Sequence, residues 1–232
     1  MDAPFSEFCI PGVSSRRMLE DIAARYAFAA RFADGEDVLD IACGSGFGAH
    51  ALAVAGAASV VGVDLSEEAL SMAKARYVHP ALRFVLGDLL QIPYHEATFG
   101  MAMCSETIEH TTEYRRALAE LHRVLRPGGV LVVTTPNRLV TTPAARRLTD
   151  PIPYPYHTQE FTAGEMTAFL REAGFGEVSV YGNRQQVLFP TRVLRHLYKR
   201  LRDPNHRQSP AYEPKKRFRQ PRNLLFVARK EP

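Results

Sequence analysis

The stretch that decides the fold is Val38-Leu39-Asp40-Ile41-Ala42-Cys43-Gly44-Ser45-Gly46-Phe47-Gly48. Its first half is a short apolar run, which is typical of a buried strand, and its second half is a glycine cluster that leads into an alanine-rich helical segment. Gly44 and Gly46 have no Cβ, so the backbone there can approach a bound molecule closely. The stretch therefore predicts a ligand-binding loop at the carboxyl end of a strand.

Outward from this stretch, short apolar strands alternate with helical segments along the chain, after a leading helix over 14–32. This alternation predicts an α/β fold, with a mostly parallel sheet and helices on both of its faces. Such a sheet binds its ligand beyond the carboxyl ends of its strands. The expected strands span residues 38–42, 59–64, 82–86, 99–104, 130–135, 177–181 and 224–229.

An acidic residue ends the second of these strands. Asp64 lies 18 residues after Gly46, at a position where a carboxylate accepts hydrogen bonds from ribose hydroxyls. The dinucleotide fingerprint G-x-G-x-x-G would need a third glycine where this chain has Ala49. The loop therefore disfavours a pyrophosphate ligand and leaves a nucleoside as the better candidate.

With these motifs in order, the chain resembles a class I S-adenosylmethionine-dependent methyltransferase from about residue 38 to residue 137. The shared motifs also include Gly87-Asp88-Leu89 and Leu125-Arg126-Pro127-Gly128-Gly129. The resemblance implies a Rossmann-like fold, with a seven-stranded, mostly parallel sheet that has one antiparallel edge strand. It implies a single methyltransferase domain over 1–232, with a helical cap over 1–35, a cofactor-binding core over 36–137, a substrate lid over 138–161 and a basic insert over 184–222.

The same resemblance implies S-adenosylmethionine as the cofactor and gives roles to named residues. Asp88 would bind the adenine amino group, Leu89 would offer its backbone N–H to the adenine ring, and Ser105 would lie near the sulfonium. Many members of the family carry glycine at the position of Ala42. The implied cofactor residues are Asp40, Ala42, Gly44 and Gly46 around the methionine part, Asp64 and Leu65 at the ribose, and Asp88, Leu89 and Ser105.

The segment Ser105-Glu106-Thr107-Ile108-Glu109-His110 follows the fourth strand, where substrate should meet cofactor. On a helical turn Glu106, Glu109 and His110 would share one face. Two carboxylates and an imidazole suit a divalent ion such as Mg²⁺ or Mn²⁺. They suit equally a catalytic base assisted by a carboxylate, with His110 taking the proton of a substrate hydroxyl and Glu106 as the second catalytic residue.

This segment resembles that of the ubiquinone-pathway O-methyltransferases. It is also similar to that of the small-RNA 3′-terminal ribose 2′-O-methyltransferases, in which a later histidine adds a metal ligand. His157 would fill that place here, and the implied metal ligands are Glu106, Glu109, His110 and His157. The Pro- and Tyr-rich stretch over 150–161 resembles the lid of bacterial methyltransferases that act on sugars or glycan precursors.

Composition and charge bound the remaining possibilities. The chain has 232 residues, 46% hydrophobic and 23% charged, which is enough apolar material for a sizeable core. No apolar run is long enough to cross a membrane, the first ten residues do not resemble a signal peptide, and the three scattered cysteines favour a reducing, cytoplasmic setting.

The basic charge is concentrated in one segment. Residues 184–222 hold 12 Lys and Arg against 2 Asp and Glu, whereas the rest of the chain holds 17 against 23. Such a segment attracts RNA, anionic lipid or a phosphorylated substrate, or is simply a solvated surface insert. The sequence predicts an O-methyltransferase for a small-molecule hydroxyl, such as a sugar, a glycan precursor or a natural-product intermediate. The alternatives are a metal-dependent RNA 3′-terminal ribose methyltransferase and a cofactor-binding partner protein without catalysis.

Overall fold

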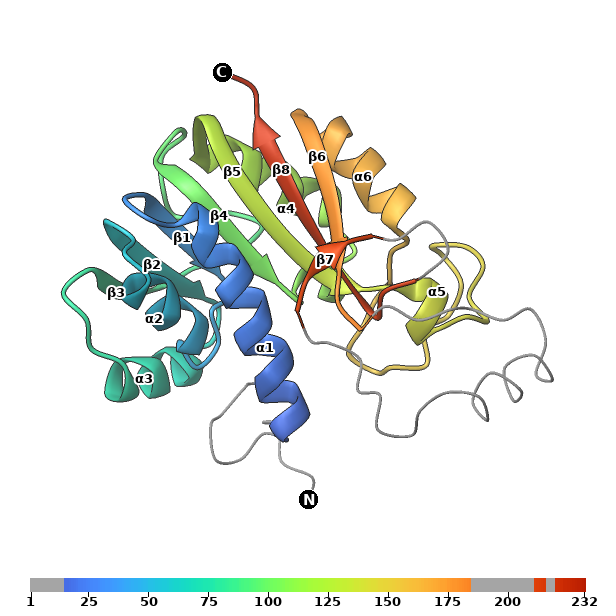
Figure 1. Ribbon diagram of the computed structural model, residues 1–232, viewed down its shortest axis with the longest axis horizontal. Helices are drawn as coiled ribbons and strands as arrows, with labels where there is room; N and C mark the ends of the chain where they lie inside the picture. The colour runs from blue at the N-terminus through green and yellow to red at the C-terminus, as the bar shows by residue number, and fades with distance from the viewer. Residues whose placement is uncertain (1–14, 185–210, 216–219) are drawn as a thin grey trace.

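The structure is a computed structural model that describes residues 15–184, 211–215 and 220–232 (Figure 1). Helices and strands alternate along most of this part of the chain. The helices are α1 (Arg16–Ala29), α2 (Phe47–Val54), α3 (Glu67–Arg76), α4 (Tyr114–Val124), α5 (Arg138–Thr141) and α6 (Ala163–Glu172), with 3₁₀ turns η1 (Ala30–Phe32) and η2 (Ile108–His110). The strands are β1 (Asp37–Ile41), β2 (Ser59–Asp64), β3 (Leu82–Leu86), β4 (Phe99–Ser105), β5 (Leu125–Pro136), β6 (Phe175–Gly182), β7 (Glu213–Pro214) and β8 (Asn223–Lys230).

All these strands form one sheet in the order β3-β2-β1-β4-β5-β8-β6-β7. The pairs from β3 to β5 are parallel, which confirms the predicted Rossmann-like α/β fold. The sheet has eight described strands, because the two-residue β7 adds an antiparallel edge to β6. β8 also runs antiparallel, and it lies inside the sheet between β5 and β6.

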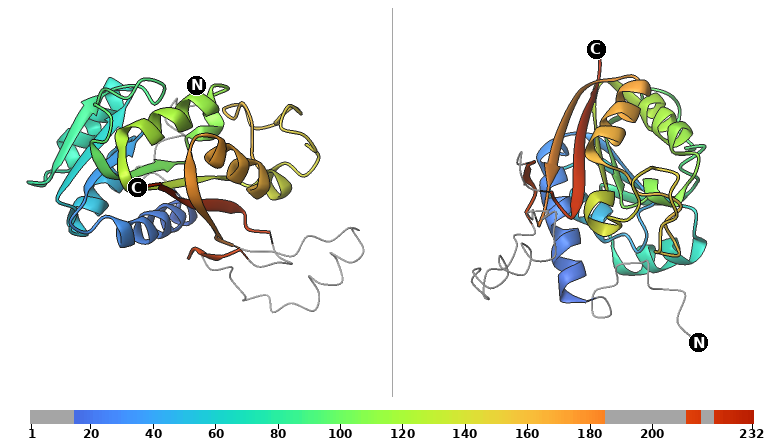
Figure 2. Two further views of the ribbon diagram at one scale, coloured as in Figure 1. Left: turned by 90° about the horizontal axis from the view of Figure 1, so that it is seen from above. Right: turned by 90° about the vertical axis from the view of Figure 1, so that its right-hand side faces the viewer.

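Two apolar cores cover the two faces of the sheet. Figure 2 shows α1 on one side of the sheet and α4 and α6 on the other. Leu118 and Leu121 of α4 are fully buried on one face, and Leu52 of α2 is fully buried on the other. Removing these side chains from water on both faces is the main stabilising contribution to a sheet of this kind.

The parallel register sets the position of the functional end. Ile41 of β1 pairs with Val63 of β2 on one side and with Cys104 of β4 on the other. The segments that leave these three strands therefore start side by side at one edge of the sheet. The Ser66 hydroxyl accepts the backbone N–H of Ala69 and so caps α3 at this edge.

The basic segment falls mostly outside the described residues, so its predicted roles stay predictions. Arg184, residues 211–215 and residues 220–222 are the parts of it that the structure describes. Across the described ranges, none of the helices combines the length and the apolar character needed to cross a membrane.

A tyrosine of α1 is hydrogen-bonded to the strand that precedes the glycine loop. The Tyr26 hydroxyl donates to both oxygens of Asp40, at 3.0 and 3.2 Å, and the Asp40 carboxylate is fully buried. The tyrosine ring also fills the space beside Gly48, where an added Cβ would lie 1.8 Å from the ring. Helix α1 and the start of α2 therefore pack against each other only because residue 48 has no side chain.

Gly48→Ala tests this close packing. The added methyl must displace the Tyr26 ring, and we expect a loss of about 1–3 kcal/mol in the free energy of unfolding. Gly164→Ala is the matched control, because Gly164 lies in α6 with nothing near its missing Cβ, and it should be neutral or stabilising by up to about 1 kcal/mol. Denaturant melts compare the two variants, and equal stability would contradict the packing argument.

The buried Asp40 predicts a pH-dependent stability. Burial raises the pKa of this carboxyl to about 7, although the hydrogen bond from Tyr26 favours the ionised form. From roughly pH 4 to pH 7 this carboxyl is ionised in the unfolded chain but still protonated in the folded protein. The contribution of Asp40 to the free energy of unfolding therefore falls as pH rises through this window and is constant above about pH 7. Asp40→Asn cannot ionise, and its stability relative to the wild type should rise by about 2–4 kcal/mol across that window. Thermal melts of both proteins at several pH values measure this difference, and parallel profiles would show that the Asp40 carboxyl does not titrate in this range.

Candidate active site

The loop after β1 bends through three left-handed residues. Gly44 has φ +54° and Gly46, the N-cap of α2, has φ +83°. Ala42 adopts φ +54°, a conformation that costs a non-glycine residue roughly 1–2 kcal/mol, which explains why glycine suits this position in the family it resembles. Asp64 holds the loop in place, because its two carboxylate oxygens accept the backbone N–H groups of Gly44 at 2.8 Å and Ser66 at 2.9 Å.

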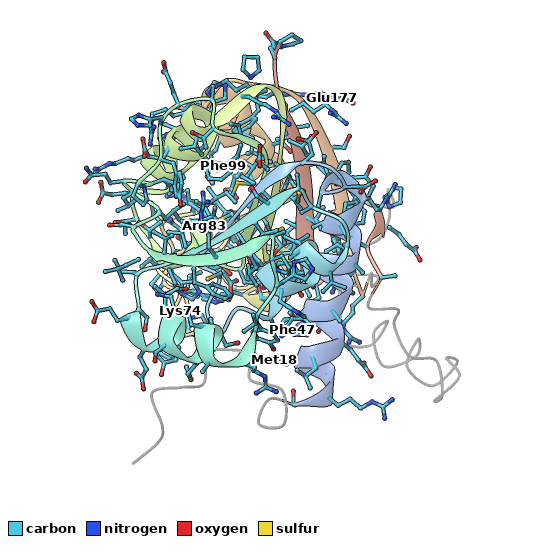
Figure 3. All side chains as sticks on the ribbon, turned by 90° about the vertical axis from the view of Figure 1, so that its left-hand side faces the viewer. Met18, Phe47, Lys74, Arg83, Phe99 and Glu177 are labelled. Atoms are coloured by element: carbon cyan, nitrogen blue, oxygen red, sulfur yellow. The ribbon has the colours of Figure 1, made fainter. Side chains whose placement is uncertain are left out.

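A cavity of about 980 Å³ opens above this loop. Its walls come from α1, from the segments after β1, β2 and β4, from the 141–160 stretch and from the start of β8. Met18 of α1 and Phe47 of α2, both labelled in Figure 3, line the cavity. The predicted site residues that line it are Ala42, Gly44, Asp64, Leu65, Ser105, Glu106, Glu109, His110 and His157.

Four of the predicted cofactor residues do not line this cavity. Asp40 lies beneath the loop, where it accepts the Tyr26 hydroxyl, and Gly46 packs against Phe84. Asp88 and Leu89 form a half-buried turn after β3, in which the Asp88 carboxylate accepts the backbone N–H of Leu90 at 2.8 Å.

The turn after β4 differs from the expected helical face. Glu106 has φ +50°, and the 3₁₀ turn η2 begins only at Ile108, so Glu106 does not share a helical face with Glu109 and His110. The Glu106 carboxylate instead accepts the Asn223 side-chain amide at 2.7 Å and lies 3.4 Å from the guanidinium of Arg25. The predicted four-residue metal set is therefore divided in the structure.

The other three residues of that set come together. The ligand atoms of Glu109, His110 and His157 lie within 4.8 Å of one another. The Glu109 carboxylate is fully buried, and neither oxygen has a hydrogen-bond partner among the described residues. Burial, followed by the negative charge of Glu106, raises the pKa of Glu109 well above its usual range, so an unpaired charge at this position is costly.

Both histidines are oriented by acceptors on the 156–160 stretch. His110 Nδ1 lies 2.8 Å from the carbonyl oxygen of Tyr156, and His157 Nδ1 lies 2.9 Å from the Glu160 carboxylate. Because each acceptor accepts a hydrogen bond from Nδ1–H, a neutral ring in this orientation has its lone pair at Nε2. The backbone N–H of Thr158 donates to the Glu109 carbonyl at 2.9 Å, which docks this stretch against η2.

Several residues at the site were not predicted from the sequence. Glu160 is buried and also accepts the Thr141 hydroxyl at 2.5 Å, and these hydrogen bonds outweigh burial and lower its pKa. Its spacing of three residues from His157 was a signal that could have identified it. Arg25 and Asn223 offered no such signal, since they lie on α1 and β8, far along the chain from Glu106.

Comparison with known proteins gives a consistent picture. Residues 39–133 match the family model described as a methyltransferase domain. A probable S-adenosylmethionine-dependent methyltransferase of Mycolicibacterium smegmatis is 38% identical over 141 residues, 61% of this chain and 52% of that protein. The O-methyltransferase cnsE of Penicillium expansum is 30% identical over 174 residues, 70% of this chain and 62% of that protein.

The solved structures show the same fold. A crystal structure of a methyltransferase from Thermotoga maritima, described as a possible histamine N-methyltransferase, has a TM-score of 0.64 at 18% identity and covers 93% of this chain and 94% of that one. The chain spans about half the length of the first two curated relatives it matches. Residues 39–133 thus match a methyltransferase domain, and the chain has the Rossmann-like fold of the solved methyltransferase structures.

Proposed function

We propose that the protein transfers the methyl group of S-adenosylmethionine to a hydroxyl of a small molecule, such as a sugar, a glycan precursor or a natural-product intermediate. The observation that carries this proposal is that one cavity is lined by both the residues proposed to bind the cofactor and a cluster of titratable residues. Asp64 and the glycine loop lie on one side, and the cluster of Glu109, His110 and His157 lies on the other.

On the cofactor side, the carboxylate of Asp64 keeps lone pairs free for ribose hydroxyls after accepting two backbone N–H groups. Ser105 and the backbone of Ala42 would flank the methionine part and the sulfonium. The half-buried turn at Asp88 and Leu89 would meet the adenine from outside the cavity described above.

On the acceptor side, methyl transfer is an in-line displacement in which the sulfur–methyl bond breaks as an oxygen–methyl bond forms. The products are S-adenosylhomocysteine and a methyl ether, and the hydroxyl proton must go to a base. His110 is the proposed base, because its Nδ1–H is held by the Tyr156 carbonyl and its Nε2 lone pair is free. The resemblance of the 105–110 segment to ubiquinone-pathway-type enzymes supports an oxygen acceptor, as does the relative named as an O-methyltransferase.

The same cluster fits a divalent cation such as Mg²⁺ or Mn²⁺. The unpaired, fully buried oxygens of Glu109 and the two oriented histidines form a donor set of one carboxylate and two imidazoles. Orientation of a ligating histidine through its other nitrogen, as in the pair of His157 with Glu160, is typical of metal sites. These two roles of His110 are alternatives, because its Nε2 lone pair can take a proton or ligate an ion but not both. When bound, such an ion would polarise the acceptor hydroxyl, and the proton would then pass to solvent instead of to His110.

A terminal ribose of RNA is the second candidate acceptor. It is favoured by the position of His157, which joins Glu109 and His110 as the resemblance to the small-RNA enzymes implies. The two candidates differ in salt dependence, because RNA binding weakens steeply as ionic strength rises and binding of a neutral sugar does not.

Methyl transfer from tritiated S-adenosylmethionine tests the proposal. Wild-type protein should label a hydroxylated acceptor from a panel of sugars, glycans and phenols, and His110→Ala should lower turnover by about 10²–10⁴-fold with little change in S-adenosylhomocysteine affinity. His50→Ala is the control, because His50 stacks on Tyr77 away from the cavity and should leave turnover unchanged.

Wild-type turnover in His110→Ala would remove His110 as the base. Label that enters RNA, and that high salt abolishes, would instead favour the ribose methyltransferase. Binding of S-adenosylhomocysteine without transfer to any hydroxylated acceptor would contradict O-methylation.

Metal binding is tested separately, by titration of the protein with Mn²⁺ and with Co²⁺ as a spectroscopic probe. We expect one bound ion, and an affinity that falls about 10–100-fold or more in Glu109→Gln and in His157→Ala but not in His50→Ala. Equal affinities in all four proteins would show that the cluster does not hold the ion and would leave His110 acting as a metal-free base.

A further inference from the structure

A buried arginine lies behind the cavity wall and has no role in the chemistry described above. Arg138 begins α5, just after β5, and its side chain is only 2% exposed. It does not line the cavity, yet one of its Nη atoms donates to the carbonyl oxygen of Glu160 at 2.7 Å. The other Nη atom donates to the carboxylate of Glu165 in α6, at 2.6 Å. Arg138 thus joins the end of the 141–160 stretch to the helix that follows it.

The stretch that Arg138 holds has little regular structure of its own. Residues 142–160 contain neither helix nor strand, so contacts at single residues fix their path. The backbone N–H and the hydroxyl of Thr158 both donate to the Glu109 carbonyl at 2.9 Å. Two residues later the guanidinium of Arg138 holds the Glu160 carbonyl, and the Arg138 backbone N–H donates to the Phe161 carbonyl at 3.0 Å. The backbone beside the cavity is therefore fixed at successive points.

The fixed backbone sets the direction of the Glu160 side chain. Its buried carboxylate lies 2.9 Å from His157 Nδ1. His157 belongs to the cluster that also contains Glu109 and His110. A shift of the Glu160 backbone would move its carboxylate away from His157, and the imidazole would then lose the partner that orients it. Arg138 thus reaches the cluster through one carbonyl and one carboxylate.

Stability alone does not account for an arginine at this position. Burying a charge is costly, and apolar side chains of similar volume often stabilise such a site as well or better. The Nε of Arg138 is buried without a hydrogen-bond partner among the described residues, so part of this cost is not offset. The guanidinium instead supplies geometry, because its two Nη groups hold a carbonyl and a carboxylate at once from one rigid plane. A lysine ammonium carries the same charge without that plane.

We propose that Arg138 is a positioning residue for the acceptor side of the site. It fixes the backbone at Glu160, and the Glu160 carboxylate then holds His157 in the cluster. The expected effect on turnover rests on the proposed function, since it takes the cluster as the place where the acceptor hydroxyl loses its proton. The expected effect on the His157 ring depends on no assigned reaction. Because Arg138 does not line the cavity, its replacement should leave cofactor binding unchanged.

The tautomer of the His157 ring tests this assignment. It is measured by ¹⁵N NMR of protein with labelled histidine, at alkaline pH where imidazoles are neutral, and the signal is assigned with His157→Ala. Wild type should carry the proton on Nδ1, which faces the Glu160 carboxylate. Arg138→Lys and Arg138→Met should shift part of the population toward Nε2–H, the form that a free imidazole side chain favours.

The same two variants are compared in methyl transfer and in calorimetry. Both should lower turnover by about tenfold or more, because the cluster loses an oriented member. Both should bind S-adenosylhomocysteine within about twofold of wild type, since the cofactor loop lies on other elements.

A double variant shows whether Arg138 acts through Glu160. Glu160→Ala removes the acceptor of the His157 Nδ1–H and should lower turnover at least as much as Arg138→Lys does. Adding Arg138→Lys to Glu160→Ala should then cause less than about a twofold further loss, because the connection to the cluster is already broken. Fully additive losses would overturn this connection.

Thr162→Ala is the matched control for a loss of stability. Thr162 caps α6 next to Glu165, and its replacement should lower the melting temperature by about 2–4 °C. It should leave the His157 tautomer and turnover as in wild type, because the contact of Arg138 with Glu160 remains.

Two results would overturn the inference. One is an unchanged His157 tautomer in both Arg138 variants, and the other is a loss of S-adenosylhomocysteine affinity as large as the loss of turnover. Either would show that Arg138 serves the fold only. A wild type that binds S-adenosylhomocysteine but methylates no hydroxyl would overturn the proposed function, and a tautomer shift in the Arg138 variants would still support the positioning of His157.

Discussion

One carboxylate holds the functional end of this fold together. Asp64 follows β2, yet it accepts one backbone N–H from the loop after β1 and one from the turn into α3. The loop contains Ala42 and Gly44 in left-handed conformations, and a backbone of this kind needs fixed partners to keep its shape. The ends of β1, β2 and β4 are neighbours here, and the segments that leave them line the cavity. By fixing the loop after β1, Asp64 keeps this cavity open at the edge of the sheet.

Several carboxylates line the cavity or lie beneath it, and their partners differ. Asp40 accepts a hydrogen bond from a tyrosine hydroxyl, and Glu160 has a histidine and a threonine as hydrogen-bond partners. Glu106 accepts a hydrogen bond from an asparagine and forms an ion pair with a buried arginine. Glu109 receives no hydrogen bond to its carboxylate from the described residues, although it is fully buried. An unpaired buried carboxylate destabilises the folded protein, so binding of a ligand, a cation or a proton at this position would stabilise it most.

The sequence predicted the strands and the loop after β1 better than it predicted the turn after β4. Apolar runs followed by Gly44 and Asp64 placed the strands, their carboxyl ends and the loop, because local patterns determine these features. The turn after β4 was predicted as helical from Glu106 onward, but the first helical turn begins at Ile108. That difference depends on Asn223, 117 residues further along the chain, which draws the Glu106 carboxylate toward β8. No local pattern contains such a contact, and tertiary structure decides it.

The family match ends at residue 133, so it includes Glu109 and His110 but not the cavity wall formed by the 141–160 stretch. That stretch places the ring of Tyr154 against those of Tyr156 and His157, with both tyrosines about half exposed. The same stretch orients His110 through the Tyr156 carbonyl and docks on Glu109 through Thr158. Under the proposed function, recognition of the acceptor and assembly of the histidine cluster would therefore depend on one segment of backbone. A change in this stretch that altered which hydroxyl is bound would then also move the groups proposed to take its proton, whereas the loop anchored by Asp64 would keep its place.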